Sequence, residues 1–304
     1  MNRGAVAWVV VAAWILVLGW NARREYFRPE AERLALGAAL LPPGAAYYAL
    51  DAGARGAGMV SVEIDTLPGR SGFYIREQHT VRLPGLGEVG ETEIRTDTWL
   101  GRGVTLDSLR RRTVRGGDTV HARARIANDS LRWEGREGAA IRPLPAATAV
   151  QTAASWPLRY VAAGGGEAGD VRRLTLLDPA TGDLREIDLR TLETGTRVFA
   201  DSADTDPDTD EWIVAGTDTV RAWRLEWVDA PSGSGAASGR AARPGAVRRE
   251  AWVDEDGRVI EAELAGGIRM RRTAFELAFF ADRDRSAEST DPADSTDRPP
   301  SEDL

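Results

Sequence analysis

Four aspartates recur at every second position of one acidic stretch, and carboxylates at this spacing are the residues most suggestive of metal chemistry. In the sequence DSADTDPDTDEW they are Asp204, Asp206, Asp208 and Asp210. Hard oxygen ligands spaced in this way can wrap a calcium ion when a loop turns back on itself. The EF-hand pattern is not met, because the sixth position from Asp204 is Thr209 rather than Gly and the twelfth is Ala215 rather than Glu. We therefore expect a solvated acidic loop rather than a metal site.

Catalytic side chains of the other common kinds are scarce. His79 and His121 are the only histidines, and both lie in stretches with strand-like alternation. Paired, they could supply a general base or half a metal site, but nothing in the sequence brings them together. The chain has no Cys, which excludes thiolate metal sites and cysteine nucleophiles, and it carries no GxSxG, HExxH, P-loop or GxGxxG motif. We expect a protein that is not an enzyme and that needs no cofactor.

Alternation of apolar and polar residues indicates the elements that position these side chains. The stretches GMVSVEIDTLPG, ETEIRTDTWL, DTVRAWRLEWV and REAWVD place apolar side chains at every second position. Short turn sequences such as RGGD, AND and DEDG separate many of the stretches, as in meandering hairpins rather than in βαβ units. The sequence predicts a mainly β protein with a large, curled, open-barrel-like antiparallel sheet and short helices.

The N-terminal segment MNRGAVAWVVVAAWILVLGWNARREYFRPE carries a membrane signal. The run from Gly4 to Trp20 has no charged residue, and at about 1.5 Å of rise per helical residue it reaches roughly 26 Å, close to the roughly 30 Å hydrocarbon thickness of a bilayer. A signal peptide has a shorter apolar core and a small-x-small cleavage site, whereas this run ends LVLGWNARR. Residues 1–22 are therefore predicted to form an uncleaved, single-pass transmembrane anchor. The arginines after the span favour a cytoplasmic body, but positive charge orients long translocated segments weakly, so both orientations stay open.

Composition divides the remaining chain into parts. Residues 23–45 are predicted to form a short helix and a stalk. The β domain is expected over residues 46–283, as two strand blocks joined by the Pro- and Ala-rich connection 141–170 and with a flexible Gly- and Ser-rich loop at 230–245. Residues 284–304 are acidic and lack apolar periodicity, which predicts a disordered tail.

Charge is distributed unevenly along the chain. The whole sequence has 47 acidic and 39 basic residues, and its net charge of −8 argues against nucleic acid as a partner. Ten arginines and five acids lie between Gly101 and Arg142, whereas eleven acids and three arginines lie between Asp178 and Glu211. The basic stretch, which includes LRRRTVR, would suit anionic headgroups close to a membrane. The alternative is a solvated strand face that pairs with the acidic segment.

Two sequences carry a family resemblance. AYYALDAGARGAGMVSVEIDTL resembles the first hairpin of the extracytoplasmic β domain that precedes the catalytic domain in bacterial transglutaminase-like membrane proteins. The closing REAWVDEDGRVIEAEL and RMRRTAFELAFF are similar to the W-x-D-x-x-G-R hairpin of that domain and, more distantly, of periplasmic proteins related to the LolA-like lipoprotein carriers. The resemblance covers residues 46–280 and implies a curved antiparallel sheet around short helices, facing the periplasm. The chain departs from the family because, without Cys, it cannot form that family's Cys-His-Asp site.

Together these observations predict a non-enzymatic protein anchored in the membrane, with its body outside the cytoplasm. Its β domain is expected to bind a hydrophobic or lipid ligand, or a protein partner in the envelope. The residues expected to line an apolar trough are Val60, Val62, Ile64, Trp99, Trp223, Leu225, Trp227 and Trp252, with an ordinary filled core as the alternative. A second hypothesis is a structural accessory module for a separate transglutaminase-like or other envelope enzyme. A third is a metal-dependent enzyme that uses the loop from Asp204 to Asp210.

Overall fold

The computed structural model describes residues 11, 13–20, 30–53, 55–67, 72–82, 91–145, 148–229, 248–264 and 266–280. Within these ranges, no helix combines the length and the apolar character that a bilayer crossing requires. Residues 13–20 are helical and fall in the predicted span, but most of the residues around them lie outside the described ranges. The anchor over residues 1–22 therefore stays a prediction. The predicted loop at 230–245 and tail at 284–304 also lie outside the described residues.

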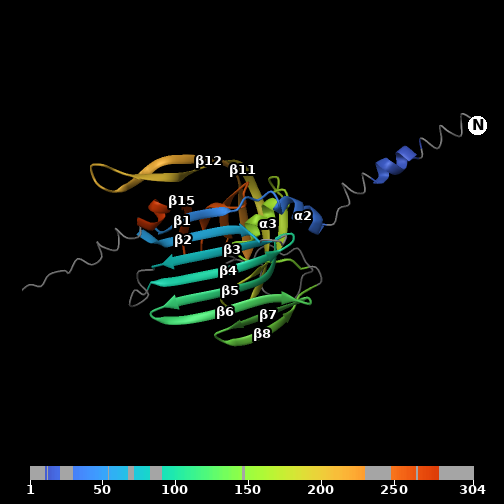
Figure 1. Cartoon of the computed structure of the whole chain (residues 1–304), viewed down its shortest axis with the longest axis horizontal. Helices are drawn as coiled ribbons and strands as arrows, with labels where there is room; N and C mark the ends of the chain where they lie inside the picture. The colour runs from blue at the N-terminus through green and yellow to red at the C-terminus, as the bar shows by residue number, and fades with distance from the viewer. Residues whose placement is uncertain are drawn as a thin grey trace, which may run out of the picture.

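The body of the chain is one large sheet of 15 strands with few helices (Figure 1). The first block of strands is β1 (Gly44–Ala52), β2 (Arg55–Thr66), β3 (Phe73–Val81), β4 (Thr92–Gly101), β5 (Thr105–Arg115), β6 (Asp118–Ala127), β7 (Ser130–Gly135) and β8 (Gly138–Pro143). The second block is β9 (Val150–Gln151), β10 (Val171–Leu177), β11 (Leu184–Thr205), β12 (Trp212–Asp229), β13 (Arg248–Asp254), β14 (Val259–Glu263) and β15 (Ile268–Thr273). The spatial order is β8-β7-β6-β5-β4-β3-β2-β1-β15-β14-β13-β12-β11-β10-β9.

Neighbouring strands are antiparallel, apart from the short parallel pair of β9 and β10. The prediction of a large antiparallel sheet is thus confirmed, because short turns force successive strands into hairpins. The two blocks meet in the middle of the sheet, where Tyr48 of β1 lies opposite Val60 of β2 on one side and Arg272 of β15 on the other. Strands from the two ends of the domain therefore form one continuous sheet.

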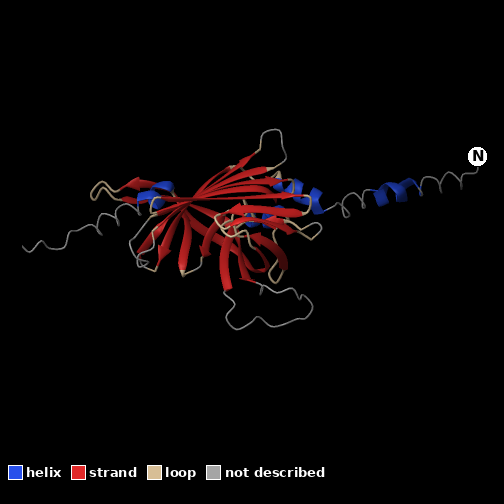
Figure 2. Ribbon diagram, turned by 90° about the horizontal axis from the view of Figure 1, so that it is seen from below, coloured by secondary structure: helices blue, strands red, loops and turns tan. Residues whose placement is uncertain are grey.

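The sheet curls, and its strands fan out when the molecule is seen from below (Figure 2). Its two ends approach each other at one place. A guanidinium nitrogen of Arg142 on β8 lies 2.9 Å from a carboxylate oxygen of Asp183, in the turn before β11. The ring of Trp133 on β7 covers Gly182, where an added Cβ would lie 2.4 Å from the ring. The sheet stays open nevertheless, because β8 and β9 form no ladder with each other.

Two short helices fill the inner face of the curl. Helix α2 (Glu30–Ala38) has acidic residues in its first turn, which favours its N-terminus through the helix dipole. Helix α3 (Trp156–Ala162) has Pro157 in its first turn, where the missing N–H costs no hydrogen bond. The connection 141–170 therefore contains a helix, which begins at Trp156.

Helix α3 contacts both halves of the sheet. Its Leu158 belongs to a core cluster with α2 and strands β3 to β7, which includes Ile75 and Leu109. Its Trp156 and Tyr160, one helical turn apart, belong to a second cluster with strands β11 to β14. The curled sheet thus closes its core around this helix.

The long hairpin of β11 and β12 extends beyond the end of β13 and projects at the upper left of Figure 1. Its far half packs against β13 and β14 through a small cluster of Phe199, Ala222, Trp252 and Ile260. A helical turn at residues 275–280 packs beside it, with Phe280 stacked at 5.2 Å on Trp212 and Phe275 at 5.1 Å from Tyr47. These aromatic contacts fix residues 275–280 against the hairpin and β1.

Candidate functional site

A cleft of about 680 Å³ opens on the inner face of the sheet, between the two helices and the β10 end of the sheet. This volume lies in the range of roughly 300–1,000 Å³ that small-molecule sites occupy. The helices contribute Glu30, Arg33, Leu34, Arg159 and Tyr160, and the strands contribute Arg172, Arg173, Leu174 and Leu189. The cleft therefore combines apolar side chains with four arginines and one carboxylate.

The local backbone explains why this part of the inner face is uncovered. Helix α3 ends at Ala162, and the chain then turns away through Gly164 and Gly165, whose φ angles are 89° and 66°. Their amide groups donate to the carbonyls of Val161 and Tyr160, so the last turn of α3 is capped by residues that accept positive φ readily. The inner sides of β10 and β11 consequently extend past the end of the helix.

The floor of the cleft is apolar. Leu34 of α2 and Leu189 of β11 are buried, and Leu174 of β10 is half-buried. The buried Tyr160 forms one wall, and its hydroxyl lies 2.8 Å from the hydroxyl of Thr191. Burial raises the pKa of Tyr160, so this side chain stays neutral and acts as an apolar surface with a fixed ring.

Arg159 holds the two helices and the sheet together at the rim. Its guanidinium donates to the carbonyl of Gly103 at 2.8 Å and to a carboxylate oxygen of Glu30 at 3.0 Å. Burial lowers the pKa of Arg159, the charge of Glu30 opposes this effect, and the neighbouring charge of Arg172 adds to it. The charge of Arg172 beside Arg159 indicates a locally positive potential at this rim.

Arg172 is the half-buried cation inside the cleft. Its guanidinium donates to the carbonyl oxygens of Gly165 and Tyr160 and lies 5.1 Å from the centroid of the Tyr160 ring. Among the residues that the structure describes, no carboxylate pairs with it, and none pairs with the exposed Arg33. Arg173, by contrast, is paired with Asp188 at 3.0 Å. Within the described residues, Arg33 and Arg172 are therefore the two arginines of the cleft without a carboxylate partner, and Arg172 is held by two carbonyl oxygens.

The eight residues predicted to line a trough are separated by the structure. Six of them are on the inner face, where Val60 and Leu225 are fully buried and Trp227 is 9 % exposed beside Trp156. Trp99 is on the outer face, half-buried against Tyr74, and Trp252 packs into the separate cluster under the long hairpin. The eight are Val60, Val62, Ile64, Trp99, Trp223, Leu225, Trp227 and Trp252, and none of them lines the cleft.

The histidines and the alternating aspartates do not meet. His79 lies 3.6 Å from the carboxylate of Glu77 on the inner side of β3, whereas His121 is exposed on β6, opposite Arg112. The aspartates from 204 to 210 form the turn of the long hairpin, where carboxylate oxygens of Asp204 and Asp206 accept backbone N–H groups. In the part of the chain that the structure describes, no three carboxylate or imidazole groups gather in a way that could hold a metal ion.

Sequence reasoning missed the cleft because its residues are far apart in the chain. Arg33, Arg159 and Arg172 meet only when α2 packs on α3 beside β10. The one local signal was the sequence VAAGGGEAGD after α3, whose glycines allow the turn that exposes the strand face.

No protein-family model matches the sequence, and no curated protein matches it either. Among solved structures, a β-barrel-like protein of domain of unknown function DUF1849 from Brucella abortus is similar, with a TM-score of 0.50 and 12 % identity over 77 % of this chain and 97 % of that chain. A DUF1089 family protein from Pseudomonas aeruginosa matches with a TM-score of 0.35 and 10 % identity, over 66 % of this chain and 86 % of that one. The first match supports the barrel-like fold that the resemblance to lipoprotein carriers implied, whereas the transglutaminase context finds no support.

Proposed function

We propose that the β domain is a non-enzymatic binding module that holds an anionic amphiphile in the cleft between α2, α3 and β10. The apolar chain of such a ligand would lie along Leu174 and Leu189, and its phosphate or carboxylate would lie between Arg33 and Arg172. The single observation that carries this proposal is an apolar floor beside two guanidinium groups without a described carboxylate partner. Hydrogen bonds from cations to an anionic head orient a ligand, while apolar contacts supply most of its affinity.

The anchor and its location belong to the same proposal. In this arrangement residues 1–22 hold the chain in the membrane, with the body outside the cytoplasm. Helix α2 begins at Glu30, shortly after the predicted anchor in the sequence, and forms one wall of the cleft, so the ligand would enter close to the bilayer. The exposed Leu36 and Leu40 on and beside α2 add apolar surface at this end of the molecule.

The test compares two ligands of equal chain length on the full chain in mild detergent. Dodecyl phosphate and dodecanol share their apolar part and differ in the anionic head. We expect Arg33→Gln and Arg172→Gln each to weaken dodecyl phosphate binding about tenfold and to leave dodecanol binding unchanged, since a hydrogen bond to a charged group contributes roughly 1.5–3 kcal/mol. Arg269→Gln, on an exposed arginine of β15 outside the cleft, is the matched control. If dodecyl phosphate bound Arg33→Gln and Arg172→Gln as tightly as it binds the unchanged protein, the anionic site would be rejected.

A second candidate function is a structural module for another envelope protein. The observation that favours it is the extent to which α3 and the sheet's own side chains fill the inner face, with Leu158, Leu189 and Leu225 almost inaccessible. Native mass spectrometry of the purified full chain, followed by lipid extraction, separates the two candidates. Lipid in stoichiometric amount supports the binding module, and a folded protein without lipid supports the structural one.

A further inference from the structure

The outer face of strands β4 to β7 carries three arginine pairs that lie directly opposite each other across neighbouring strands. Arg95 of β4 is opposite Arg112 of β5, and Arg110 of β5 is opposite Arg123 of β6. Arg125 of β6 is opposite Arg132 of β7. All six side chains are exposed, and we call this surface the arginine face: Arg95, Arg110, Arg112, Arg123, Arg125 and Arg132.

This arrangement lowers the stability of the sheet. Residues directly opposite in an antiparallel pair have Cβ atoms about 4.5–5.5 Å apart, and like charges at that distance repel each other. The pairs Arg110–Arg123 and Arg125–Arg132 are therefore unfavourable in the isolated molecule, whereas Arg95 of the third pair is compensated by Asp97 at 3.2 Å. A ligand or surface with negative charge would relieve the repulsion.

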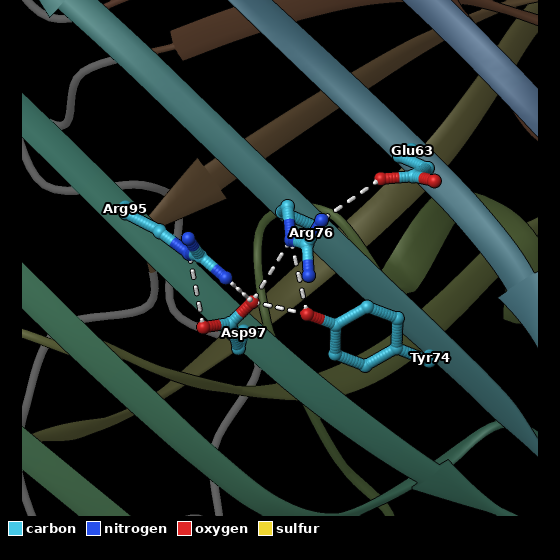
Figure 3. Close-up of polar contacts among 5 residues, drawn as sticks. All are labelled: Glu63, Tyr74, Arg76, Arg95 and Asp97. Atoms are coloured by element: carbon cyan, nitrogen blue, oxygen red, sulfur yellow. Dashed lines mark hydrogen bonds and ion pairs between the residues drawn. The ribbon is translucent and has the colours of Figure 1, made fainter.

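On the neighbouring strands β2, β3 and β4, arginine side chains are paired with carboxylates (Figure 3). Asp97 of β4 accepts hydrogen bonds from Tyr74, Arg76 and Arg95, and Arg76 also contacts Glu63 of β2 at 3.4 Å. Burial alone would raise the pKa of Asp97, but these hydrogen bonds outweigh burial and hold the pKa below its usual range. Carboxylates thus alternate with arginines across β2, β3 and β4.

Close ion pairs become sparse from β5 onward. Arg110 lies directly opposite Asp97, the carboxylate that Arg76 and Arg95 contact, but it forms no ion pair with it. Among the described residues, Arg112, Arg123, Arg125 and Arg132 form no ion pair with a carboxylate either. Arg110 lies over the ring of Trp99 at 5.4 Å, which positions the guanidinium without neutralising it. The described ion pair between the basic stretch and the acidic one, Arg142 with Asp183, lies at the β8 edge of the sheet. Glu134 is the acid opposite Arg123, and it forms no ion pair with it.

We propose that the arginine face docks on the surface of an anionic phospholipid bilayer. The argument is charge complementarity between an array of guanidinium groups and a surface of phosphate headgroups, to which arginine binds in a bidentate manner. Neighbouring strands are about 4.8 Å apart and alternate residues about 6.8 Å apart, so the cations are spread over a surface rather than gathered at one point. Nucleic acid suits the face less well, because the chain has a net charge of −8, Trp99 is covered by Arg110, and the neighbouring Tyr74 packs against Trp99.

The test measures how strongly the full chain prefers anionic vesicles. Binding to phosphatidylglycerol vesicles is compared with binding to phosphatidylcholine vesicles, so that any contribution of the apolar N-terminal segment is present in both. We expect a preference for the anionic vesicles that weakens as salt is raised. The triple variant Arg110→Gln, Arg123→Gln, Arg125→Gln should reduce that preference by about tenfold or more, because each arginine near an anionic surface contributes severalfold.

A matched control changes the net charge by the same amount elsewhere. The triple variant Arg248→Gln, Arg269→Gln, Arg271→Gln removes three exposed arginines of β13 and β15 and should keep the preference. The charge-conserving triple variant Arg110→Lys, Arg123→Lys, Arg125→Lys should retain most of the binding, which separates loss of charge from misfolding. Equal losses in both glutamine triples, no preference for anionic vesicles, or tighter binding to duplex DNA than to vesicles would each overturn the proposal. These variants leave Arg33 and Arg172 intact, so this result is independent of the cleft.

Discussion

Gly37 of α2 and Ala162 of α3 are in backbone contact. A Cβ atom added to Gly37 would lie 2.0 Å from the carbonyl oxygen of Ala162, a separation that real Cβ contacts do not reach. The absence of a side chain at position 37 therefore sets how closely the two helices approach. This contact also sets the width of the cleft, because Leu34 and Arg159 face it from the same two helices.

Gly37→Ala should lower the free energy of unfolding. In an isolated helix the change would add up to about 1 kcal/mol of stability, since Ala is the better helix former. Here the added methyl group meets backbone atoms that cannot rotate away, and overpacking of this kind costs about 1–3 kcal/mol. Urea denaturation of the full chain measures the difference. An increase in stability would show that α2 does not pack on α3 in this way, and Ala39→Ser, on an exposed position after the same helix, should leave stability nearly unchanged.

Trp227→Ala should cost about 3–5 kcal/mol, the value for an aromatic residue in a filled core. Trp227 is 9 % exposed, and its ring lies 5.6 Å from that of Trp156 at a tilt of 57°. Trp99→Ala is the control, because Trp99 is half-exposed on the outer face and should cost distinctly less. Chemical denaturation followed by circular dichroism compares the two, and similar small losses would indicate that the inner face near Trp227 is open.

The strands could be predicted from local alternation, but the faces could not. Alternation identifies Val60 and Ile64 as one side of β2 because a strand has a period of two residues. Alternation alone cannot show which side chains of another strand lie on the same face of the sheet as Val60 and Ile64, because that depends on the register between strands. In β4 the small polar Thr98 is fully buried while Trp99 faces outward, which is contrary to what hydrophobicity alone favours.

The cleft and the arginine face depend on contacts that sequence spacing does not contain. Arg33 and Arg172 meet through the packing of α2, α3 and β10, and Arg110 meets Arg123 only in the observed register of β5 and β6. A shift of that register by one residue would turn both Arg123 and Arg125 of β6 to the other face. The charge of the basic stretch was visible in the sequence, whereas its concentration on one outer face was not.

Arg272→Gln should destabilise the fold far more than the same change at the neighbouring Arg271. The guanidinium of Arg272 lies 2.7 Å from a carboxylate oxygen of Asp254, which is 2 % exposed. Removing one partner of a buried ion pair leaves an uncompensated charge, at a cost of about 3–5 kcal/mol. Arg271 pairs with Asp51 on the exposed side of β15, where such pairs contribute about 0–1 kcal/mol.

The size of this loss should depend on pH, and the pKa of Asp254 gives its sign. Burial raises the pKa of Asp254, while the backbone N–H of Arg258 and the charge of Arg272 oppose the rise. A folded-state pKa above the unfolded value of about 3.9 means that the carboxyl group contributes its stability at low pH and loses it as pH rises through the folded-state pKa. Without Arg272 this pKa rises further, so protonation removes the buried charge more readily in the variant. The deficit of Arg272→Gln in urea denaturation should therefore be largest above the folded-state pKa of Asp254 and shrink as the pH falls through that pKa, and a deficit independent of pH would contradict the pairing with Asp254.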